Sequence, residues 1–347
     1  MKTSLTKEQT QAFVERMSDA DRRFKEFYPG ERAARQPVHT VYGGAHLFKS
    51  DSAKKLGGLG LRIMDTYAGD PFAFARVLEL RGADRLPTDH GETAAVVEQV
   101  HKDPEAARRA NPDAWLACTV YDRVREKLQT EPIEDFRIDF EDGYGNRPDE
   151  EEDAEAVRTA EAVAQGMKDG TLPPFLGIRI KPFTAEMVER GVRTLDLFMT
   201  TLGEKAGGDV PPHFVVTLPK VTTPEQVEGL ADLLRGAEQN ADMDEGALKL
   251  EMMIEMPQAI IAHDGTFALP KLLSAAKGRG VAAHFGTYDY TAGVSITAQH
   301  QDIQHPSCDF AKDVMQVALA GTGVWISDGA TTVMPIGPHA ANKDGPP

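Results

Sequence analysis

The sequence predicts a parallel α/β fold of the (β/α)8-barrel type, on two observations. Strand-like runs with apolar residues at every second position alternate with helical stretches along the chain, which is typical of a parallel sheet with right-handed crossovers. The positions between those apolar residues carry charged side chains of both signs. A sheet closed into a barrel explains both features, because helices cover its outer face and charged side chains converge on its interior.

Two of these runs end on a carboxylate. Residues 249–257 contain Glu255, and residues 281–290 contain Asp289. A buried parallel strand has this pattern when its C-terminal end carries chemistry. Period-two alternation places Glu255 and Met253 on one face of the first run. A half-buried surface strand with solvated glutamates would give the same alternation.

Two further runs repeat the pattern, with charged residues on the face opposite the apolar ones. They are residues 136–142, with Arg137, Asp139 and Glu141, and residues 177–182, with Arg179 and Lys181. In a closed barrel the charged faces of all these strands meet in one interior, so the pattern favours a polar site over separate solvated surfaces.

The size and composition of the chain suit one barrel domain of about 250 residues with additions. It has 347 residues, 41% hydrophobic and 27% charged, with a formal net charge of -16. That charge argues against binding to nucleic acid or to anionic membranes, which need basic faces. No signal peptide or long apolar run is present, and Cys118 and Cys308 form no disulfide or metal motif, so we expect a cytoplasmic protein.

The first part of the chain is expected to be helical, apart from one strand. Thr6 and Gln9 make a capping box for a helix within an N-terminal extension, residues 1–36. A first strand at 38–44 ends on paired glycines, and the His46 that follows could touch a substrate or be merely solvated. Residues 50–130 are too long for one crossover and predict a helical insertion.

The barrel core is expected over residues 134–337, within a single domain 1–347. After the strand at 38–44, further strands are predicted at 136–142, 175–181, 214–220, 248–255, 281–288 and 323–329. Helices are predicted at 52–67, 70–80, 111–128, from the acidic residues 149–153, at 184–202, 224–239 and 257–276, and from about 309. Only residues 331–336 remain for an eighth strand. An edge so poorly covered tends to be paired, so we expect a homo-oligomer.

Five motifs resemble one known superfamily in their order and approximate spacing. They are Asp139-Phe140-Glu141-Asp142, Ile178-Arg179-Ile180-Lys181-Pro182, Leu218-Pro219-Lys220, Ile254-Glu255-Met256-Pro257 and Gly286-Thr287-Tyr288-Asp289-Tyr290. Together they are similar to the HpcH/HpaI aldolase, citrate lyase beta-subunit (CitE-like) and malate synthase superfamily, over about residues 134–330. The resemblance implies a TIM barrel. It also implies a site for Mg2+ or Mn2+ formed by a Glu and an Asp from consecutive strands, here Glu255 and Asp289.

The resemblance also implies catalytic roles. The essential arginine of the family matches Arg179, and its lysine after the fourth strand matches Lys220. Glu141 and Asp142 would hold metal-bound waters in catalysis, as carboxylates around a metal commonly do. The substrate-binding residues expected beside Arg179 are Gly43, Gly286 and Tyr288.

Chemistry fits this implication. Mg2+ prefers oxygen ligands and usually keeps positions for water and substrate, and a 2-oxo acid could occupy them through its carboxylate and keto oxygens. The metal would then polarise the carbonyl, and Arg179 would stabilise the enolate as it forms. The chain is therefore predicted to be a Mg2+-dependent carbon-carbon lyase of the aldolase type, acting on a small anionic 2-oxo acid.

Two alternatives stay open at this stage. An acyl-CoA lyase or synthase (citrate lyase, malyl-CoA lyase or malate synthase-like) is the first, but no basic patch for coenzyme A phosphates is evident. Malate synthases draw their catalytic aspartate from a large C-terminal domain. No such domain is expected here, because the predicted barrel core runs to residue 337 of 347. The second alternative is a non-catalytic oxo-acid-binding barrel, since Gly143 and Tyr144 stand where the aldolases place a histidine that serves as part of the base.

Overall fold

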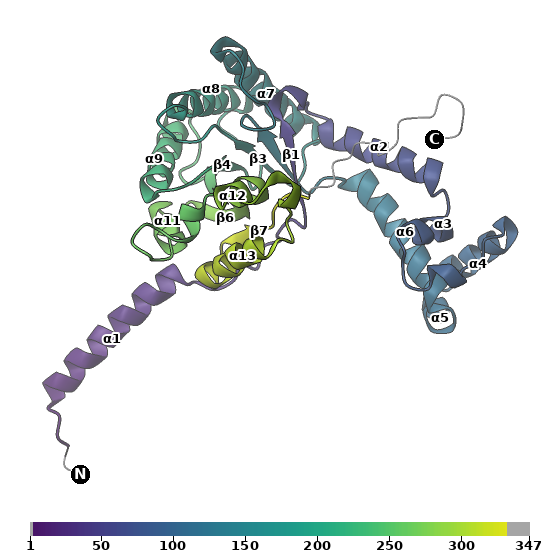
Figure 1. Cartoon of the computed structure of the whole chain (residues 1–347), viewed down its shortest axis with the longest axis horizontal. Coiled ribbons are helices and arrows are strands. Elements are labelled where there is room, and N and C mark those ends of the chain that lie inside the picture. The colour runs from purple at the N-terminus through teal and green to yellow at the C-terminus, as the bar shows by residue number, and fades with distance from the viewer. Residues whose placement is uncertain (1–2, 332–347) are drawn as a thin grey trace. The chain divides into compact units, whose positions relative to one another are not determined.

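The computed structural model describes residues 3–331 of the chain. Within that range one sheet contains seven strands in the sequential order β1 to β7 (Figure 1). The strands are β1 (Thr40–Gly44), β2 (Asp135–Asp139), β3 (Phe175–Arg179), β4 (Val215–Leu218), β5 (Lys249–Ile254), β6 (Gly280–Phe285) and β7 (Trp325–Ser327). The pairs β1–β2, β4–β5, β5–β6 and β6–β7 are parallel. The α/β class with a parallel sheet is confirmed.

The helices lie between these strands, and one precedes them. They are α1 (Lys7–Phe27), α2 (Ser52–Tyr67), α3 (Pro71–Val77), α4 (His90–Lys102), α5 (Pro104–Ala110), α6 (Pro112–Thr130), α7 (Asp149–Asp169), α8 (Val188–Ala206), α9 (Pro224–Asn240), α10 (Pro257–Ile260), α11 (Leu269–Ala275), α12 (Thr287–Gly293) and α13 (Pro306–Leu319). The capping box predicted for α1 is confirmed, with Thr6 as its N-cap and Gln9 as the reciprocal partner. Among the described residues, no helix is both long and apolar enough to cross a membrane.

The chain divides into two compact units. One unit contains residues 1–36, 178–196 and 215–347, and the other contains residues 37–177 and 197–214. The division falls inside β3, where the Phe175 amide donates to Glu134 in one unit and the Ile180 amide donates to Thr217 in the other. Barrel closure stays a prediction, because residues 332–336 of the expected eighth strand lie outside the described part of the chain. The single-domain organisation also stays a prediction.

In the unit of residues 37–177, the strands β1 and β2 pair in register from Thr40↔Asp135 to Gly44↔Asp139. Helices α2 to α6 fill most of the segment between them and form their own apolar clusters. One cluster includes Phe72 and Cys118, and another includes Phe74 and Tyr121. Pro at the first positions of α3, α5 and α6 lacks the N–H that a helix start would leave unsatisfied, which explains where these helices begin.

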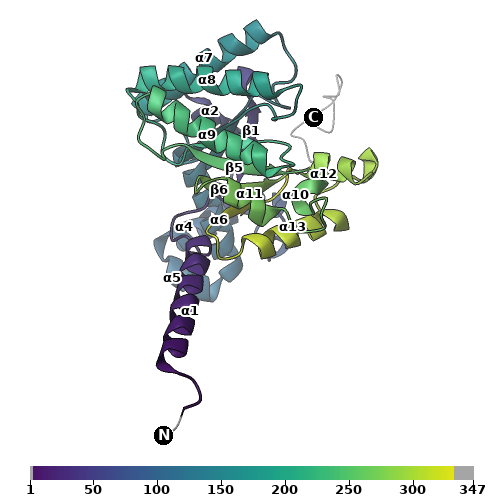
Figure 2. The ribbon, with the colours of Figure 1, turned by 90° about the vertical axis from the view of Figure 1, so that its left-hand side faces the viewer.

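In the other unit, α9 and α11 pack on each other beside β5 (Figure 2). The buried side chains of Glu238 and Arg279 form two hydrogen bonds, of 2.6 and 2.8 Å, between the end of α9 and the start of β6. Glu238 also accepts the amides of Gly246 and Leu248, at 3.0 and 2.8 Å. This cluster holds α9, β5 and β6 together at the N-terminal ends of the strands.

The continuous helix predicted for residues 257–276 is wrong. The structure has two short helices, α10 and α11, separated by a turn in which Ile261 pairs with Phe267 in an antiparallel bridge. The Asp264 carboxylate accepts the Thr266 amide at 3.0 Å, and Gly265 has a φ of 78°. An aspartate that caps its own turn and a glycine in the left-handed region favour this turn over a helix.

Candidate functional site

Glu255 directly follows β5 and is 2% exposed. The strand alternation places it on the same face as Met253 and Glu251, as predicted. Its Oε1 accepts the backbone N–H of Lys220 at 2.7 Å. Because β4 and β5 are parallel neighbours, the loop after β4 lies beside the end of β5, and that is how Lys220 reaches this carboxylate.

Lys220 contacts two of the predicted site carboxylates. Besides the amide contact with Glu255, its ammonium lies 3.2 Å from Oδ2 of Asp289. Its backbone has a φ of 50°, in the left-handed region that non-glycine residues adopt at a cost. The site is partly open at this point, since the side chains of Lys220 and Asp289 are 24% and 35% exposed.

Asp289 was expected at the end of a strand, and the structure corrects this. β6 ends at Phe285, and Asp289 lies in the first turn of α12, which begins at Thr287. A carboxylate in this position is favoured by the partial positive charge of the helix N-terminus. Asp289 therefore reaches the Lys220 ammonium, which belongs to the loop after β4, from a helix.

Gly286 explains how Glu255 fits beside β6. A Cβ at Gly286 would lie 2.5 Å from both Cβ and Oε2 of Glu255, closer than real Cβ atoms approach. The Gly286 amide donates to the carbonyl of Ile254 at 3.1 Å, so the two backbones are held together here. The role of this glycine is thus to leave room for the Glu255 carboxylate, next to the place predicted for substrate.

Arg179 lies at the end of β3 and is 7% exposed. Its Nη1 donates to the sulfur of Met253 at 3.4 Å. Met253 precedes Glu255 by one alternation on the same face of β5, so the guanidinium lies one layer deeper than that carboxylate. In the same interior, the Thr217 hydroxyl donates to Oε1 of Glu251 at 2.7 Å.

Three buried polar residues of this interior were not chosen from the sequence. Lys181 and Glu251 are 3% and 2% exposed, and His284, which pairs in register with Met253, is 8% exposed. Lys181 and Glu251 follow the alternation of charged with apolar residues, so this signal could have placed them among the candidate site residues. His284 stands in the otherwise apolar run of β6, where a single histidine gives no periodic signal.

Tyr288 is 41% exposed, and its hydroxyl donates to the carbonyl of Thr331 at 3.3 Å. The remaining predicted site residues belong to the other compact unit, within residues 37–177; they are Gly43, Glu141 and Asp142. There Glu141 is 7% exposed and Asp142 is exposed. A Cβ on Gly43 would lie 2.7 Å from the Phe136 ring, so packing by itself accounts for this glycine.

The loop that carries Glu141 is organised by Asp139. The two carboxylate oxygens of Asp139 accept the amides of Glu141 and Gly143, at 2.9 and 2.7 Å. Asp139 is 1% exposed, so these hydrogen bonds are shielded from water. The sequence marked Asp139 as part of a motif, but the structure shows that it shapes the loop.

The donors present suit a divalent cation. Among the described residues, no group of three or more His, Cys, Asp or Glu side chains could hold a metal ion. Mg2+ needs fewer protein ligands, because it commonly binds one or two carboxylates and keeps several waters. Glu255 accepts the backbone amide of Lys220 and Asp289 contacts its ammonium, and the missing Cβ of Gly286 leaves room for Oε2 of Glu255. Hard carboxylate oxygens in this arrangement fit Mg2+ or Mn2+.

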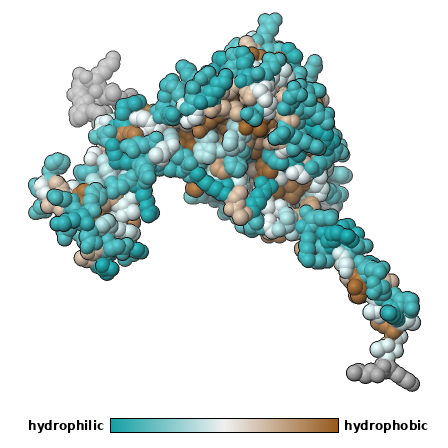
Figure 3. Space-filling model, turned by 180° about the vertical axis from the view of Figure 1, so that it is seen from behind, coloured by the Kyte–Doolittle hydropathy of each residue, from teal (hydrophilic) through white to brown (hydrophobic). Residues whose placement is uncertain are grey.

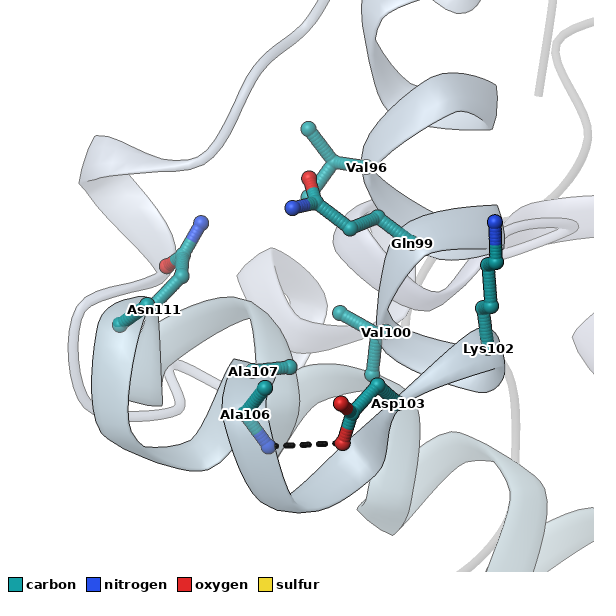
Figure 4. A pocket seen from close by; sticks show the side chains of 9 residues that line it. Val96, Gln99, Val100, Lys102, Asp103, Ala106, Ala107 and Asn111 are labelled. Atoms are coloured by element: carbon teal, nitrogen blue, oxygen red, sulfur yellow. Dashed lines mark hydrogen bonds between the residues drawn. The ribbon is translucent and has the colours of Figure 1, made fainter.

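A cavity of about 460 Å3 lies elsewhere, between α4 and α5 (Figure 4). Its lining consists mainly of aliphatic and amide side chains, among them Val96, Gln99 and Val100. The Asp103 carboxylate at its wall accepts the Ala106 amide at 2.9 Å and caps α5. The carboxylate in the lining is thus engaged in capping a helix. The carboxylates near Lys220 remain the candidate site.

Several solved structures are similar to this chain at low identity. A citrate lyase from Burkholderia xenovorans LB400 is 17% identical with a TM-score of 0.46, and the match covers 62% of each chain. A pyruvate/acetyl-CoA ternary complex of Haloferax volcanii malate synthase is 16% identical with a TM-score of 0.41, covering 57% of this chain and 50% of that one. The magnesium/glyoxylate complex of the same enzyme is 16% identical with a TM-score of 0.43, covering 58% and 55%.

This chain thus spans less than two thirds of the length of those structures. No curated protein matches it. The model of one protein family, described as "Domain of unknown function (DUF6986)", matches residues 17–345, and the chain therefore belongs to that family.

Proposed function

We propose that the chain is a carbon-carbon lyase of the aldolase type, which acts on a small anionic 2-oxo acid with Mg2+ or Mn2+ as cofactor. The observation that carries the proposal is the cluster of Lys220, Glu255 and Asp289, which follow β4, β5 and β6 respectively. Active sites of parallel α/β folds lie at these carboxyl ends of the strands. The five motifs of the superfamily named above include all three residues.

Glu255 and Asp289 are the proposed ligands of the cation. When bound, the cation would supply Lewis acidity toward the keto oxygen of the substrate. The Lys220 amide holds Oε1 of Glu255, and Oε2 of the same carboxylate lies beside Gly286. The Lys220 ammonium is a donor for Asp289 and for an anionic substrate, and its partial exposure allows it to exchange between them.

Arg179 is proposed to stabilise the negative charge that develops on the substrate oxygen when the carbon-carbon bond breaks or forms. A guanidinium carries donors in a planar fork that suits a carboxylate or an enolate oxygen. The Arg179 side chain is buried, and electrostatic stabilisation is stronger away from water. Its contact with the Met253 thioether places the guanidinium next to the strand that carries Glu255.

The remaining assignments are part of the same proposal. Glu141 and Asp142 would hold waters around the cation, and Gly43, Gly286 and Tyr288 would contact the substrate. Gly286 has local support, because it borders the Glu255 carboxylate. Tyr288 follows it by two residues and has a partly exposed ring, so it is available for such a contact.

The experiment that tests the function follows exchange of the substrate's α-proton with solvent. Pyruvate and oxaloacetate would be incubated in deuterated buffer with the chain and Mg2+, and deuterium uptake measured by NMR. We expect exchange that EDTA abolishes and added Mg2+ or Mn2+ restores. The Glu255→Gln variant is the control, because it removes a charge that the cation needs.

A second measurement identifies the reaction class. Glyoxylate and metal would be supplied with either pyruvate or acetyl-CoA, and products followed by mass spectrometry. Condensation with pyruvate supports the aldolase. Condensation only with the thioester would instead support the acyl-CoA lyase or synthase alternative, and neither exchange nor product with any oxo acid would favour a non-catalytic binding protein.

A further inference from the structure

Helix α1 carries an apolar face that the described part of its own chain does not cover. The helix is 21 residues long, and none of its residues is buried within residues 3–331. Phe13, Met17 and Phe24 are 54%, 41% and 60% exposed. In Figures 1 and 2 the helix extends away from α13, and Figure 3 shows hydrophobic side chains along it.

The apolar residues of α1 repeat with the spacing of a coiled coil. Phe13, Met17, Ala20, Phe24 and Phe27 are separated by four, three, four and three residues. These are alternating d and a positions of a heptad, the seam along which two helices pack knobs into holes. We refer to these five residues as the α1 stripe. It runs over most of the three heptads that 21 residues can make.

The stripe needs cover from something beyond residues 3–331 for the helix to be stable. Most helical stability in proteins comes from packing an amphipathic face, and isolated helices are marginal in water. The segment that follows α1 is well anchored, since the Gly30 amide donates to Gly321 at 2.8 Å and Gln36 donates to Ile326 at 3.0 Å. The helix is therefore held at its C-terminal end, next to the edge strand β7, and presents its stripe outward.

The charges beside the stripe identify the partner. In this heptad Arg16 is a g position and Asp21 is the e position that faces it from a second, parallel copy. An antiparallel copy would instead bring Arg16 near Arg23, with like charges opposed. Asp21 is 58% exposed, and its ion pair with Lys25, at 2.7 Å, lies on the surface of the helix, so Asp21 can reach a second helix.

A membrane surface suits the helix less well. Lys7–Phe27 contains five basic and five acidic residues, and the whole chain has a formal net charge of -16. Amphipathic helices that bind anionic lipid carry an excess of Lys and Arg on the polar face. We propose that the α1 stripe is a self-association surface, on which two copies of this chain pair their N-terminal helices in parallel.

The test compares two adjacent substitutions in the full chain. Met17→Glu puts a charge in the seam, whereas Ser18→Glu places the same charge at a b position outside it. Light scattering after gel filtration, over a dilution series, should show the wild type and Ser18→Glu associating. Met17→Glu should weaken association by at least about a hundredfold, because a buried unpaired charge is costly. Circular dichroism should show both variants folded.

A charge exchange tests the parallel orientation. Arg16→Glu should weaken association, and the double variant Arg16→Glu with Asp21→Arg should restore it, since the same pair is re-formed with its signs reversed. A wild type that stays monomeric at micromolar concentration would overturn the proposal. If that monomer floated with phosphatidylcholine/phosphatidylserine vesicles, the stripe would be a membrane-binding face instead. Undiminished association of Met17→Glu would place the interface elsewhere, and failure of the double variant to recover would rule out the parallel pairing.

Discussion

At the scale of residues, the candidate site depends on one close approach. Glu255 can lie beside β6 only because residue 286 is a glycine, and it is held in place by the amide of Lys220. Lys220 donates that hydrogen bond from a left-handed backbone conformation, which is costly for a residue other than glycine. A residue kept in a costly conformation next to the buried carboxylate of Glu255 indicates a site that the rest of the fold maintains.

The carboxylates themselves give the first prediction. Glu255→Gln and Asp289→Asn should each weaken Mn2+ binding at least about tenfold while the protein stays folded, because each removes a charged oxygen ligand. Isothermal calorimetry measures the affinity. Glu225→Gln, at an exposed acid of α9, is the control and should bind as the wild type. Unchanged affinity in both site variants would exclude this pair as the ligands.

Gly286→Ala gives the second prediction. The added Cβ would collide with Glu255 at 2.5 Å, so the carboxylate must move, and we expect a loss of about 1 to 3 kcal/mol in unfolding free energy together with weaker Mn2+ binding. Gly229→Ala in α9 is the matched control, because its Cβ meets no atom within 4 Å. Alanine there should be neutral or stabilise the protein by up to about 1 kcal/mol. Urea unfolding of both variants measures the difference.

Arg179→Lys gives the third. Lysine keeps the charge but loses the planar fork, so turnover of a confirmed substrate should fall by at least about a hundredfold with the fold intact. Steady-state kinetics would test this, and circular dichroism would serve as the folding control. Turnover at the wild-type rate would mean that Arg179 has a structural role and no part in the reaction.

At the scale of elements, α9, β5 and β6 are joined by Glu238 and Arg279. Burial by itself raises the pKa of Glu238, but the hydrogen bonds from Arg279 and from the Gly246 and Leu248 amides outweigh it, and the pKa lies below its usual value. Arg279 has its pKa raised by the hydrogen bond with Glu238. Ionised Glu238 therefore stabilises the folded chain.

The fourth prediction follows with its sign. A carboxyl whose folded pKa is depressed contributes full stability above the unfolded pKa of about 4.3, and loses it as the pH falls through the folded pKa. Glu238→Gln should cost about 3 to 5 kcal/mol at pH 7, because it leaves Arg279 buried without its charge partner. In urea titrations at descending pH, the difference between wild type and variant should shrink. Asp232→Asn, in the exposed pair with Lys277, should cost far less than Glu238→Gln, because water screens a surface ion pair.

At the scale of the whole molecule, cation binding should be visible as stability. A ligand that binds only the folded chain stabilises it by RT ln(1 + [L]/Kd), which is about 2.7 kcal/mol at a hundredfold excess over Kd. Excess Mn2+ should therefore raise the Tm of the wild type, and EDTA should reverse the rise. The combined variant Glu255→Gln/Asp289→Asn should show no such shift in differential scanning calorimetry. An equal shift in that variant would indicate that the cation binds elsewhere.

The sequence by itself determined the strand pattern and the carboxylate at Glu255. Each of the seven predicted strands was located, because period-two alternation or a short apolar run reflects burial in a sheet and needs no tertiary information. The carboxylate after β5 was found in the same way. The capping box of Thr6 and Gln9 was also readable, because its hydrogen bonds are local.

Only the tertiary structure decided which of the marked residues touch. The contact of Lys220 with both Glu255 and Asp289 depends on loops after three strands meeting at one edge, and sequence spacing does not give those distances. Asp289 was expected at a strand end and lies at a helix start, because β6 ends at Phe285 and Gly286 is already the N-cap of α12. The helix that carries the α1 stripe was predicted from its capping box, but the exposure of the stripe appears only in the folded chain, since burial is a property of neighbours that are distant in sequence.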